Sequence, residues 1–192
     1  MDRCVVQAAA DPGRIARGDP VDARALACSR ALDAIVQARL HVVVTHASLV
    51  EWQRSARWAK FVRWRARLEE RGLLEDAGAL DTASIDEAIA ALLPPDRRRA
   101  AHKDAHLVAA AVDHADARLL STDRRARGHF VALWVAGQAC DGARCLARLG
   151  ALHWVDPTED EAVAVWLGDW MPDRPPWTIA GRAAPAAGTA QR

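Results

Sequence analysis

The chain has 192 residues, with 26 basic and 25 acidic side chains that give a net charge of +1. This length suits one domain with a full hydrophobic core. The charge balance excludes a uniformly basic nucleic-acid-binding protein, so any affinity for nucleic acid must come from a local basic surface. Nothing at the start of the sequence resembles a signal peptide, and no apolar run approaches the ~20 residues of a membrane span, which predicts a soluble, cytoplasmic protein that does not contact a membrane.

The first half of the chain alternates short apolar runs with longer stretches of helical period. Cys4–Gln7 is predicted as a first strand, and a helix is predicted from about Val21 to Ala38. His41–Thr45 is a β-branched run without polar alternation, which is typical of a buried parallel strand. Ser48 to about Arg71 is predicted as a basic helix that ends at Gly72 as its C-cap.

The second half continues the same alternation. Ser84–Glu87 matches a capping box, and the helix that it opens is predicted to end at Leu93, before Pro94–Pro95. A further helix is predicted to begin just before Lys103 and to end near Ala115. The remaining predicted elements are a strand at 117–121, a helix at about 141–149, a strand at 152–155 and a helix at about 158–170.

This order of elements predicts an α/β fold, a three-layer α/β/α sandwich with a central parallel sheet of four to five strands. The predicted domain spans residues 1–157, and a C-terminal helix over 158–171 is expected to pack on it. Residues 172–192 are rich in Pro, Gly, Ala and Arg, which predicts a disordered tail.

Acidic residues follow the predicted strands, where ligands of open α/β sheets gather. Asp123 comes directly after the strand at 117–121, Asp104 is expected in the first turn of the helix before that strand, and Glu51 follows the second strand. Each acid alone is also explained as a helix-capping or solvated side chain. Together they predict a carboxylate pocket, and carboxylates are the ligands that Mg²⁺ and Mn²⁺ prefer.

Several strings resemble PIN-domain proteins. His102–Ala111 with Ala117–Asp123 is similar to the family's segment in which one acid opens a helix and a second acid follows the next strand. His41–Thr45 with Leu49–Trp52 resembles the family's second strand and the helix after it, and Leu152–Pro157 is similar to its closing strand. The resemblance covers roughly residues 3–157 and implies a PIN-like fold.

The resemblance also implies a function, the metal-dependent hydrolysis of RNA phosphodiesters by an endoribonuclease. Glu51, Asp104 and Asp123 take the family's catalytic and metal-binding positions, with Mg²⁺ or Mn²⁺ as the cofactor. A bound cation lowers the pKa of an attacking water and neutralises charge on the phosphate. The implied partners are RNA, single-stranded rather than duplex, an antitoxin protein and a second copy of the chain in a homodimer.

One family position is changed, because Gln7 stands where the family's first strand ends in an aspartate. A glutamine coordinates a metal through its carbonyl oxygen but brings no charge. Gln7 itself or Asp11, four residues on, is expected to complete the metal shell. Two interpretations follow, a nuclease with an altered set of acids or a catalytically degenerate PIN fold that binds RNA or a protein; an unrelated α/β ligand-binding domain is a third.

Side chains around the predicted acids are candidates for substrate binding. Ser121 is expected to orient a ligand or a phosphate, and its alternative role is that of a polar residue at a strand end. Arg54 and Arg57 belong to a basic stretch interleaved with tryptophans, and Arg124 follows Asp123. Such residues bind phosphates and stack on bases, although the same pattern arises when the aromatic side chains face the core and the arginines are solvated.

Overall fold

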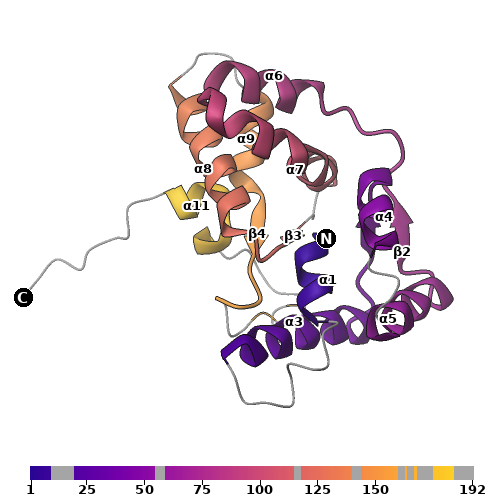
Figure 1. Cartoon of the computed structure of the whole chain (residues 1–192). Coiled ribbons are helices and arrows are strands. Elements are labelled where there is room, and N and C mark those ends of the chain that lie inside the picture. Colours follow the sequence, from indigo (N-terminus) through magenta and orange to yellow (C-terminus); the bar gives the residue numbers. More distant parts are fainter. Residues whose placement is uncertain are drawn as a thin grey trace, which may run out of the picture. The chain divides into compact units, whose positions relative to one another are not determined.

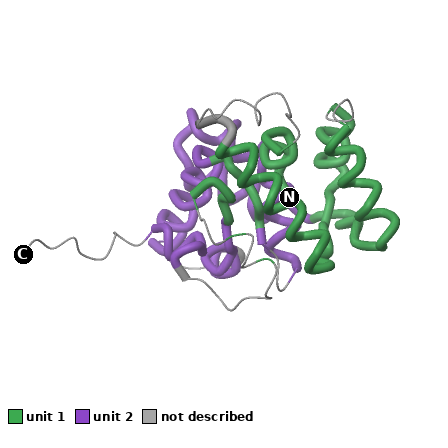
Figure 2. Tube along the Cα trace, turned by 90° about the horizontal axis from the view of Figure 1, so that it is seen from below, with its two compact units in different colours: residues 1–80, 119–123, 155–172 green, residues 81–118, 124–154, 173–192 purple. Residues whose placement is uncertain are grey.

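A computed structural model of the chain describes residues 1–9, 20–54, 59–114, 118–139, 144–159, 163, 167 and 175–183. Helices dominate these residues (Figure 1). The chain divides into two compact units (Figure 2). Unit 1 comprises residues 1–80, 119–123 and 155–172, and unit 2 comprises residues 81–118, 124–154 and 173–192.

Unit 1 contains a two-stranded parallel sheet and several helices. The helices are α1 (Arg3–Ala9), α3 (Pro20–Gln37), α4 (His46–Gln53) and α5 (Ala59–Glu70). Strand β1 (Val42–Val44) pairs with β2 (Leu74–Asp76), with Val42 opposite Leu74. The chain passes between these two strands through α4 and α5, as a parallel connection requires a long crossover.

An aromatic cluster in the core of unit 1 joins α4 to α5. The ring centroid of Trp52 lies 5.6 Å from that of Phe61 and 5.8 Å from that of Trp64, both in edge-on arrangements that favour aromatic pairs. The indole N–H of Trp64 donates to the carbonyl oxygen of Leu32 in α3 at 3.0 Å. Trp52 and Trp64 are therefore core residues, and the described tryptophans of this basic stretch do not stack on bases.

Unit 2 is built from helices that approach each other closely. They are α6 (Ala83–Leu92), α7 (Pro95–Asp113), α8 (Arg124–Gln138), α9 (Arg144–Ala151), the 3-10 helix η1 (Pro175–Trp177) and α11 (Ile179–Ala183). At the contact between α8 and α9, a Cβ added to Gly137 would clash with Cδ1 of the buried Leu146. This position of α8 therefore has no room for a larger side chain unless Leu146 moves.

The predicted fold class is wrong. Among the described residues, strands pair only in two separate two-stranded sheets, β1 with β2 and β3 (Arg118–Leu120) with β4 (His153–Val155), rather than in one central sheet between helical layers. Cys4–Gln7, the predicted first strand, lies in α1. The spacing of the buried residues explains this difference, because Val5 and Ala9 are one helical turn apart and face the same side of α1.

Other predicted elements are confirmed with shifted ends. The strands at 42–44, 118–120 and 153–155 are present, while β2 and α8 were not expected. Helix α7 begins at Pro95, well before Lys103, because proline is favoured in the first turn of a helix. Gly72 ends α5 as predicted, and its φ of 64° is the left-handed conformation that glycine adopts readily. Thr82, rather than Ser84, is the N-cap of α6.

The C-terminal region was predicted as a helix over 158–171 and a disordered tail over 172–192. Most of the first segment lies outside the described residues, as do 172–174 and 184–192. Residues 175–183 form η1 and α11 instead of a disordered segment. Ile179 is fully buried, and its N–H donates to the carbonyl oxygen of Leu152 at 2.9 Å, which ties this segment to unit 2.

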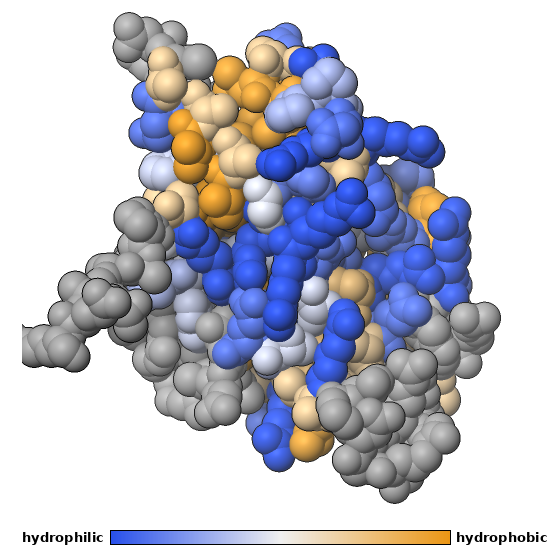
Figure 3. All heavy atoms as spheres, turned by 60° about the vertical axis from the view of Figure 1, so that its left-hand side comes forward, coloured by the Kyte–Doolittle hydropathy of each residue, from blue (hydrophilic) through white to orange (hydrophobic). Residues whose placement is uncertain are grey.

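The described helices include none that is long and apolar enough to span a membrane. On the face that Figure 3 shows, hydrophilic side chains surround a smaller apolar area. The large apolar side chains that are exposed are Leu26, Val50, Val62 and Val135. They belong to four different helices, and such single exposed residues are normal on a protein surface.

Candidate functional site

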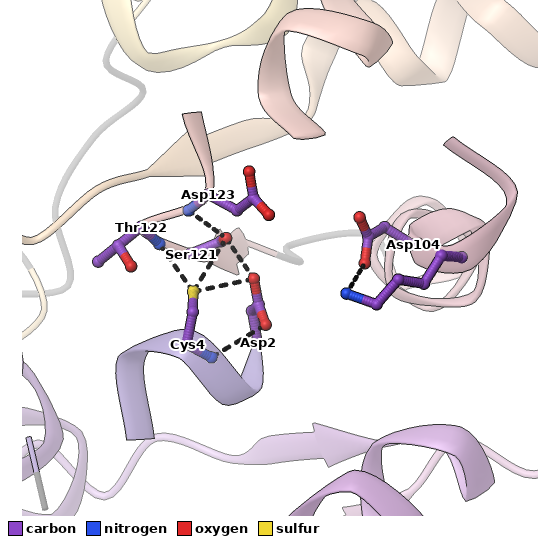
Figure 4. Close-up of polar contacts among 7 residues, drawn as sticks. Asp2, Cys4, Asp104, Ser121, Thr122 and Asp123 are labelled. Atoms are coloured by element: carbon purple, nitrogen blue, oxygen red, sulfur yellow. Dashed lines mark hydrogen bonds and ion pairs between the residues drawn. The ribbon is translucent and has the colours of Figure 1, made fainter. Parts of the chain in front are cut away.

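A group of polar side chains in unit 1 joins the start of α1 to the segment after β3 (Figure 4). This group, the Asp2 cluster, consists of Asp2, Cys4, Ser121, Thr122 and Asp123. Asp2 precedes α1, and its Oδ1 accepts a hydrogen bond from the N–H of Cys4 at 3.1 Å, as an N-cap carboxylate does. The Ser121 hydroxyl donates to Asp2 Oδ2 at 2.5 Å, so residues 119 positions apart meet at one carboxylate.

Ser121 connects the two acids of the Asp2 cluster. Its Oγ donates to Asp2 and accepts a hydrogen bond from the N–H of Asp123 at 3.0 Å. Ser121 is buried, whereas Asp2 and Asp123 are half-buried. In Figure 4 the carboxylates of Asp2 and Asp123 lie on the same side of Ser121. A buried hydroxyl thus holds the carboxylate of Asp2 and the backbone N–H of Asp123, and both acidic side chains are half-buried.

Cys4 adds a second link between the two segments. Its thiol donates to Asp2 Oδ2 at 3.0 Å, and its sulfur accepts a hydrogen bond from the N–H of Thr122 at 3.2 Å. Burial, followed by the negative charge of Asp2, raises the pKa of the Cys4 thiol to about 12. The thiol is therefore protonated at neutral pH and acts as a hydrogen-bond donor rather than as a nucleophile.

A cationic side chain borders the Asp2 cluster within unit 1. Nη2 of Arg24, on α3, donates to Oγ1 of Thr122 at 2.7 Å. Arg24 is exposed, and a guanidinium carries five N–H groups, so most of its donors remain for other partners. The site therefore has a guanidinium beside Thr122 in addition to its two carboxylates.

The three predicted acids are divided between the units. Asp123 belongs to the Asp2 cluster, and Glu51 lies in the same unit on α4, a helix that contacts α1. The side chain of Glu51 is half-buried and makes no hydrogen bond or ion pair with another described residue. Asp104 lies in unit 2, where it is buried in the middle of α7 with Lys103 Nζ 3.6 Å from its Oδ1. The prediction that Asp104 opens a helix is therefore wrong, because α7 starts earlier.

The other predicted site residues lie apart from the Asp2 cluster or outside the description. Gln7 is exposed on α1, and it is Asp2 rather than Gln7 that reaches Ser121. Asp11 and Arg57 fall outside the described residues. Arg54 is exposed at the C-cap of α4, and Arg124 is exposed at the start of α8 in unit 2.

Sequence reasoning missed Asp2, although the sequence contains a signal for it. An aspartate directly before apolar residues of helical spacing is typical of an N-cap, and Asp2 precedes Val5, Val6 and Ala9. If the same run formed a strand, Gln7 would stand at the strand end instead. Arg24 had no comparable signal, because it meets Thr122 only through the fold.

The donor atoms of the Asp2 cluster suit a hard cation. In the part of the chain that the structure describes, no three His, Cys, Asp or Glu side chains form a metal-binding group by themselves. The carboxylates of Asp2 and Asp123 are nevertheless oxygen donors, and proteins commonly hold Mg²⁺ with one or two carboxylates, waters and substrate phosphates, while the Cys4 sulfur is bound to Asp2 and Thr122. The chemistry of these residues therefore fits Mg²⁺ or Mn²⁺ together with an anionic substrate.

Comparisons with known proteins were made for the whole chain. No protein-family model, no curated protein and no solved structure matches it. The resemblance to PIN-domain proteins rests on short sequence strings alone. Function is therefore inferred from the Asp2 cluster and its surroundings.

Proposed function

We propose that the chain is a Mg²⁺- or Mn²⁺-dependent endoribonuclease, as its resemblance to PIN-domain proteins implies, with Asp2 and Asp123 among its metal-binding carboxylates. The observation that supports this proposal is the Ser121 hydroxyl, which donates to Asp2 at 2.5 Å and accepts from the N–H of Asp123 at 3.0 Å. Asp2 supplies the negative charge that Gln7 lacks. Cation binding then requires neither Gln7 nor Asp11.

Asp2, Asp123, Ser121 and the neighbouring Arg24 have distinct roles in this proposal. Asp2 and Asp123 would hold the cation, and a bound cation supplies an acidified water and neutralises charge on the phosphate. Ser121 fixes the orientation of Asp2 through its hydrogen bond to Oδ2. Arg24 attracts the substrate phosphate from the rim of the cluster, because its guanidinium is exposed beside Thr122.

Glu51 stays in the proposal as a further carboxylate of the reaction, whereas Asp104, which lies in unit 2, stays a prediction from the sequence. Glu51 shares unit 1 with the Asp2 cluster and is half-buried on a helix that contacts α1. Asp104 is a buried carboxylate in the middle of a helix, and buried carboxylates are costly and often functional. The predicted antitoxin partner, homodimer and cytoplasmic location rest on the resemblance and the composition, and they stay predictions.

A second candidate function is RNA binding without cleavage. The observation that favours it is an arginine pair on the exposed side of α5, where Arg63 and Arg67 are one helical turn apart. Neither guanidinium forms an ion pair with another described residue. Two such cations on one helix face bind the phosphate backbone of a nucleic acid.

The test is cleavage of labelled single-stranded RNA by the purified chain in Mn²⁺. We expect cleavage that a chelator abolishes and that falls at least about 100-fold in Asp123→Asn and in Asp2→Asn, because each change removes charge that holds the cation. Asp33→Asn is the matched control, since Asp33 is exposed on α3 and has no described partner. Glu51→Gln and Asp104→Asn are measured alongside.

Two outcomes would count against the nuclease. Cleavage that survives unchanged in Asp123→Asn would indicate a contaminating enzyme. RNA binding by the wild type without cleavage, lost on replacing Arg63 and Arg67 by alanine, would favour the second candidate function.

A further inference from the structure

We infer that Cys4 is a positioning residue that orients the Asp2 carboxylate for cation binding and holds it beside the segment that carries Asp123. This inference rests on the proposed function, because it assigns Asp2 to a metal site. It concerns the geometry of the carboxylate, and Cys4 itself is not a ligand. The Asp2 cluster offers two independent reasons for it.

The first reason is that Cys4 contacts both oxygens of Asp2. Its backbone N–H donates to Oδ1 at 3.1 Å, and its thiol donates to Oδ2 at 3.0 Å. A carboxylate held through both oxygens cannot turn about its terminal bond without breaking one of these contacts. The Ser121 hydroxyl also donates to Oδ2, and the Cys4 backbone N–H stays in place when the thiol is removed, so the thiol acts as a second donor that fixes the position of Oδ2 from another direction.

The second reason is that the same sulfur reaches the other segment. Cys4 Sγ accepts a hydrogen bond from the N–H of Thr122 at 3.2 Å and lies 3.5 Å from Ser121 Oγ. Thr122 directly precedes Asp123, so the sulfur ties the start of α1 to the backbone beside the second acid. Removing the sulfur breaks this link and leaves the Ser121 hydroxyl and the backbone bond from Asp2 N–H to the Leu120 carbonyl oxygen to join the two segments. Outer contacts of this kind tune metal sites, because they determine where the ligand oxygens point.

The chain provides a matched control in Cys28. Cys28 is buried on α3 in the same unit, and burial raises the pKa of its thiol to about 12, as it does for Cys4. It makes no hydrogen bond with the described residues of the Asp2 cluster. Cys28→Ala therefore removes an equivalent buried thiol without touching Asp2.

The experiment measures Mn²⁺ affinity of the whole chain from the electron paramagnetic resonance signal of free Mn²⁺, without RNA. We expect Cys4→Ala to weaken Mn²⁺ binding about 10-fold, the usual loss for an outer contact of a metal ligand. Cys4→Ser, which keeps a donor and an acceptor, should restore most of that affinity. Cys28→Ala should bind Mn²⁺ as the wild type does. Circular dichroism checks that each variant is folded, and Cys4→Val replaces Cys4→Ala if the alanine variant unfolds.

The outcomes separate this inference from the proposed function. The positioning role of Cys4 would be overturned if Cys4→Ala left the Mn²⁺ affinity unchanged, or if Cys4→Ala and Cys28→Ala lowered it equally. The metal site itself would stand in either case, provided that Asp123→Asn still abolishes Mn²⁺ binding. No Mn²⁺ binding by the wild type, or binding that Asp123→Asn leaves intact, would overturn the metal site and the role of Cys4 with it.

Discussion

Units 1 and 2 each contain a carboxylate that takes two side-chain hydrogen bonds, yet the two arrangements differ in what they hold together. In unit 2, Asp86 accepts from the Thr82 hydroxyl at 2.6 Å and lies 2.7 Å from Nδ1 of His102. Thr82 precedes Asp86 on the chain by four residues and His102 lies on the next helix, and the side chains of Asp86 and His102 are each 39% exposed. In unit 1, Asp2 takes its bonds from Cys4 and from the distant, buried Ser121.

This difference shows that the surroundings of a hydrogen bond, rather than its length, decide its contribution. Water replaces a lost partner at an exposed pair, so such pairs contribute less than about 1 kcal/mol. A buried hydroxyl that loses its acceptor keeps its desolvation cost, about 1–3 kcal/mol. Unit 1 therefore depends on its polar cluster, whereas unit 2 should depend on the close packing of its helices.

The largest expected effect comes from breaking the cluster in unit 1. Asp2→Ala should lower the free energy of unfolding by about 3 kcal/mol, because α1 loses its N-cap and the buried Ser121 hydroxyl loses its acceptor. Urea unfolding followed by circular dichroism measures this change. Asp33→Ala, on the exposed side of α3, should leave stability nearly unchanged. Equal midpoints for the two variants would contradict the contrast between buried and exposed carboxylates.

A change in the packing of unit 2 should have the next largest effect. Gly137→Ala should destabilise the chain by about 2 kcal/mol, because its new methyl group displaces the buried Leu146. Gly128 is the control on the same helix, since a Cβ there meets nothing within 4 Å. Gly128→Ala should instead stabilise by about 0.5–1 kcal/mol through helix propensity. Thermal unfolding compares the two, and opposite signs are the expected result.

The smallest effect concerns the exposed carboxylate of unit 2 and depends on pH. Partial desolvation opposes ionisation of Asp86, but hydrogen bonds from Thr82 and His102 and the charge of His102 outweigh it and lower its pKa below the ordinary 3.8. A lowered pKa contributes stability above the ordinary pKa that is lost as the pH falls through the folded one. Asp86→Asn should therefore cost less than about 1 kcal/mol at pH 6.

The difference between wild type and Asp86→Asn should shrink as the pH falls from about 4 towards 2. Urea unfolding at several pH values in this range measures it. A difference that stays constant with pH would show that the Asp86 network stabilises unit 2 by packing alone.

Much of the secondary structure was predictable, because it depends on local patterns. The β-branched run at 42–44 and the glycine at position 72 give a strand and a helix end that the structure confirms. The prediction of a strand at Cys4–Gln7 was wrong because a short apolar run of four residues fits a strand and a buried helix turn equally well. The fold class failed for a different reason, since local patterns do not tell whether strands join one sheet or two.

The candidate site was predictable only in part. Asp123 follows a real strand and belongs to the Asp2 cluster, as the position of an acid after a strand suggested. Asp2 was not predicted, because a first strand at Cys4–Gln7 would end at Gln7 and leave Asp2 outside the site. Asp104 lies in the middle of α7 rather than in its first turn, because Pro95 begins this helix although a Pro-Pro pair also fits a helix end. The contact between Arg24 and Thr122 joins residues 98 positions apart, and sequence spacing carries no information about it.

The sulfur of Cys4 also determines how the cluster opens to solvent. The amide proton of Cys4 is hydrogen-bonded to the Asp2 carboxylate, and that of Thr122 to the Cys4 sulfur. The amide proton of Asp123 is hydrogen-bonded to the Ser121 hydroxyl oxygen. The Asp2 carboxylate accepts hydrogen bonds from the Cys4 thiol and the Ser121 hydroxyl, and the Cys4 sulfur lies 3.5 Å from the Ser121 oxygen. Releasing one of the three amides should therefore disturb the other two. These three protons should therefore exchange with solvent through one shared opening, in which the first turn of α1 and the segment after β3 separate together.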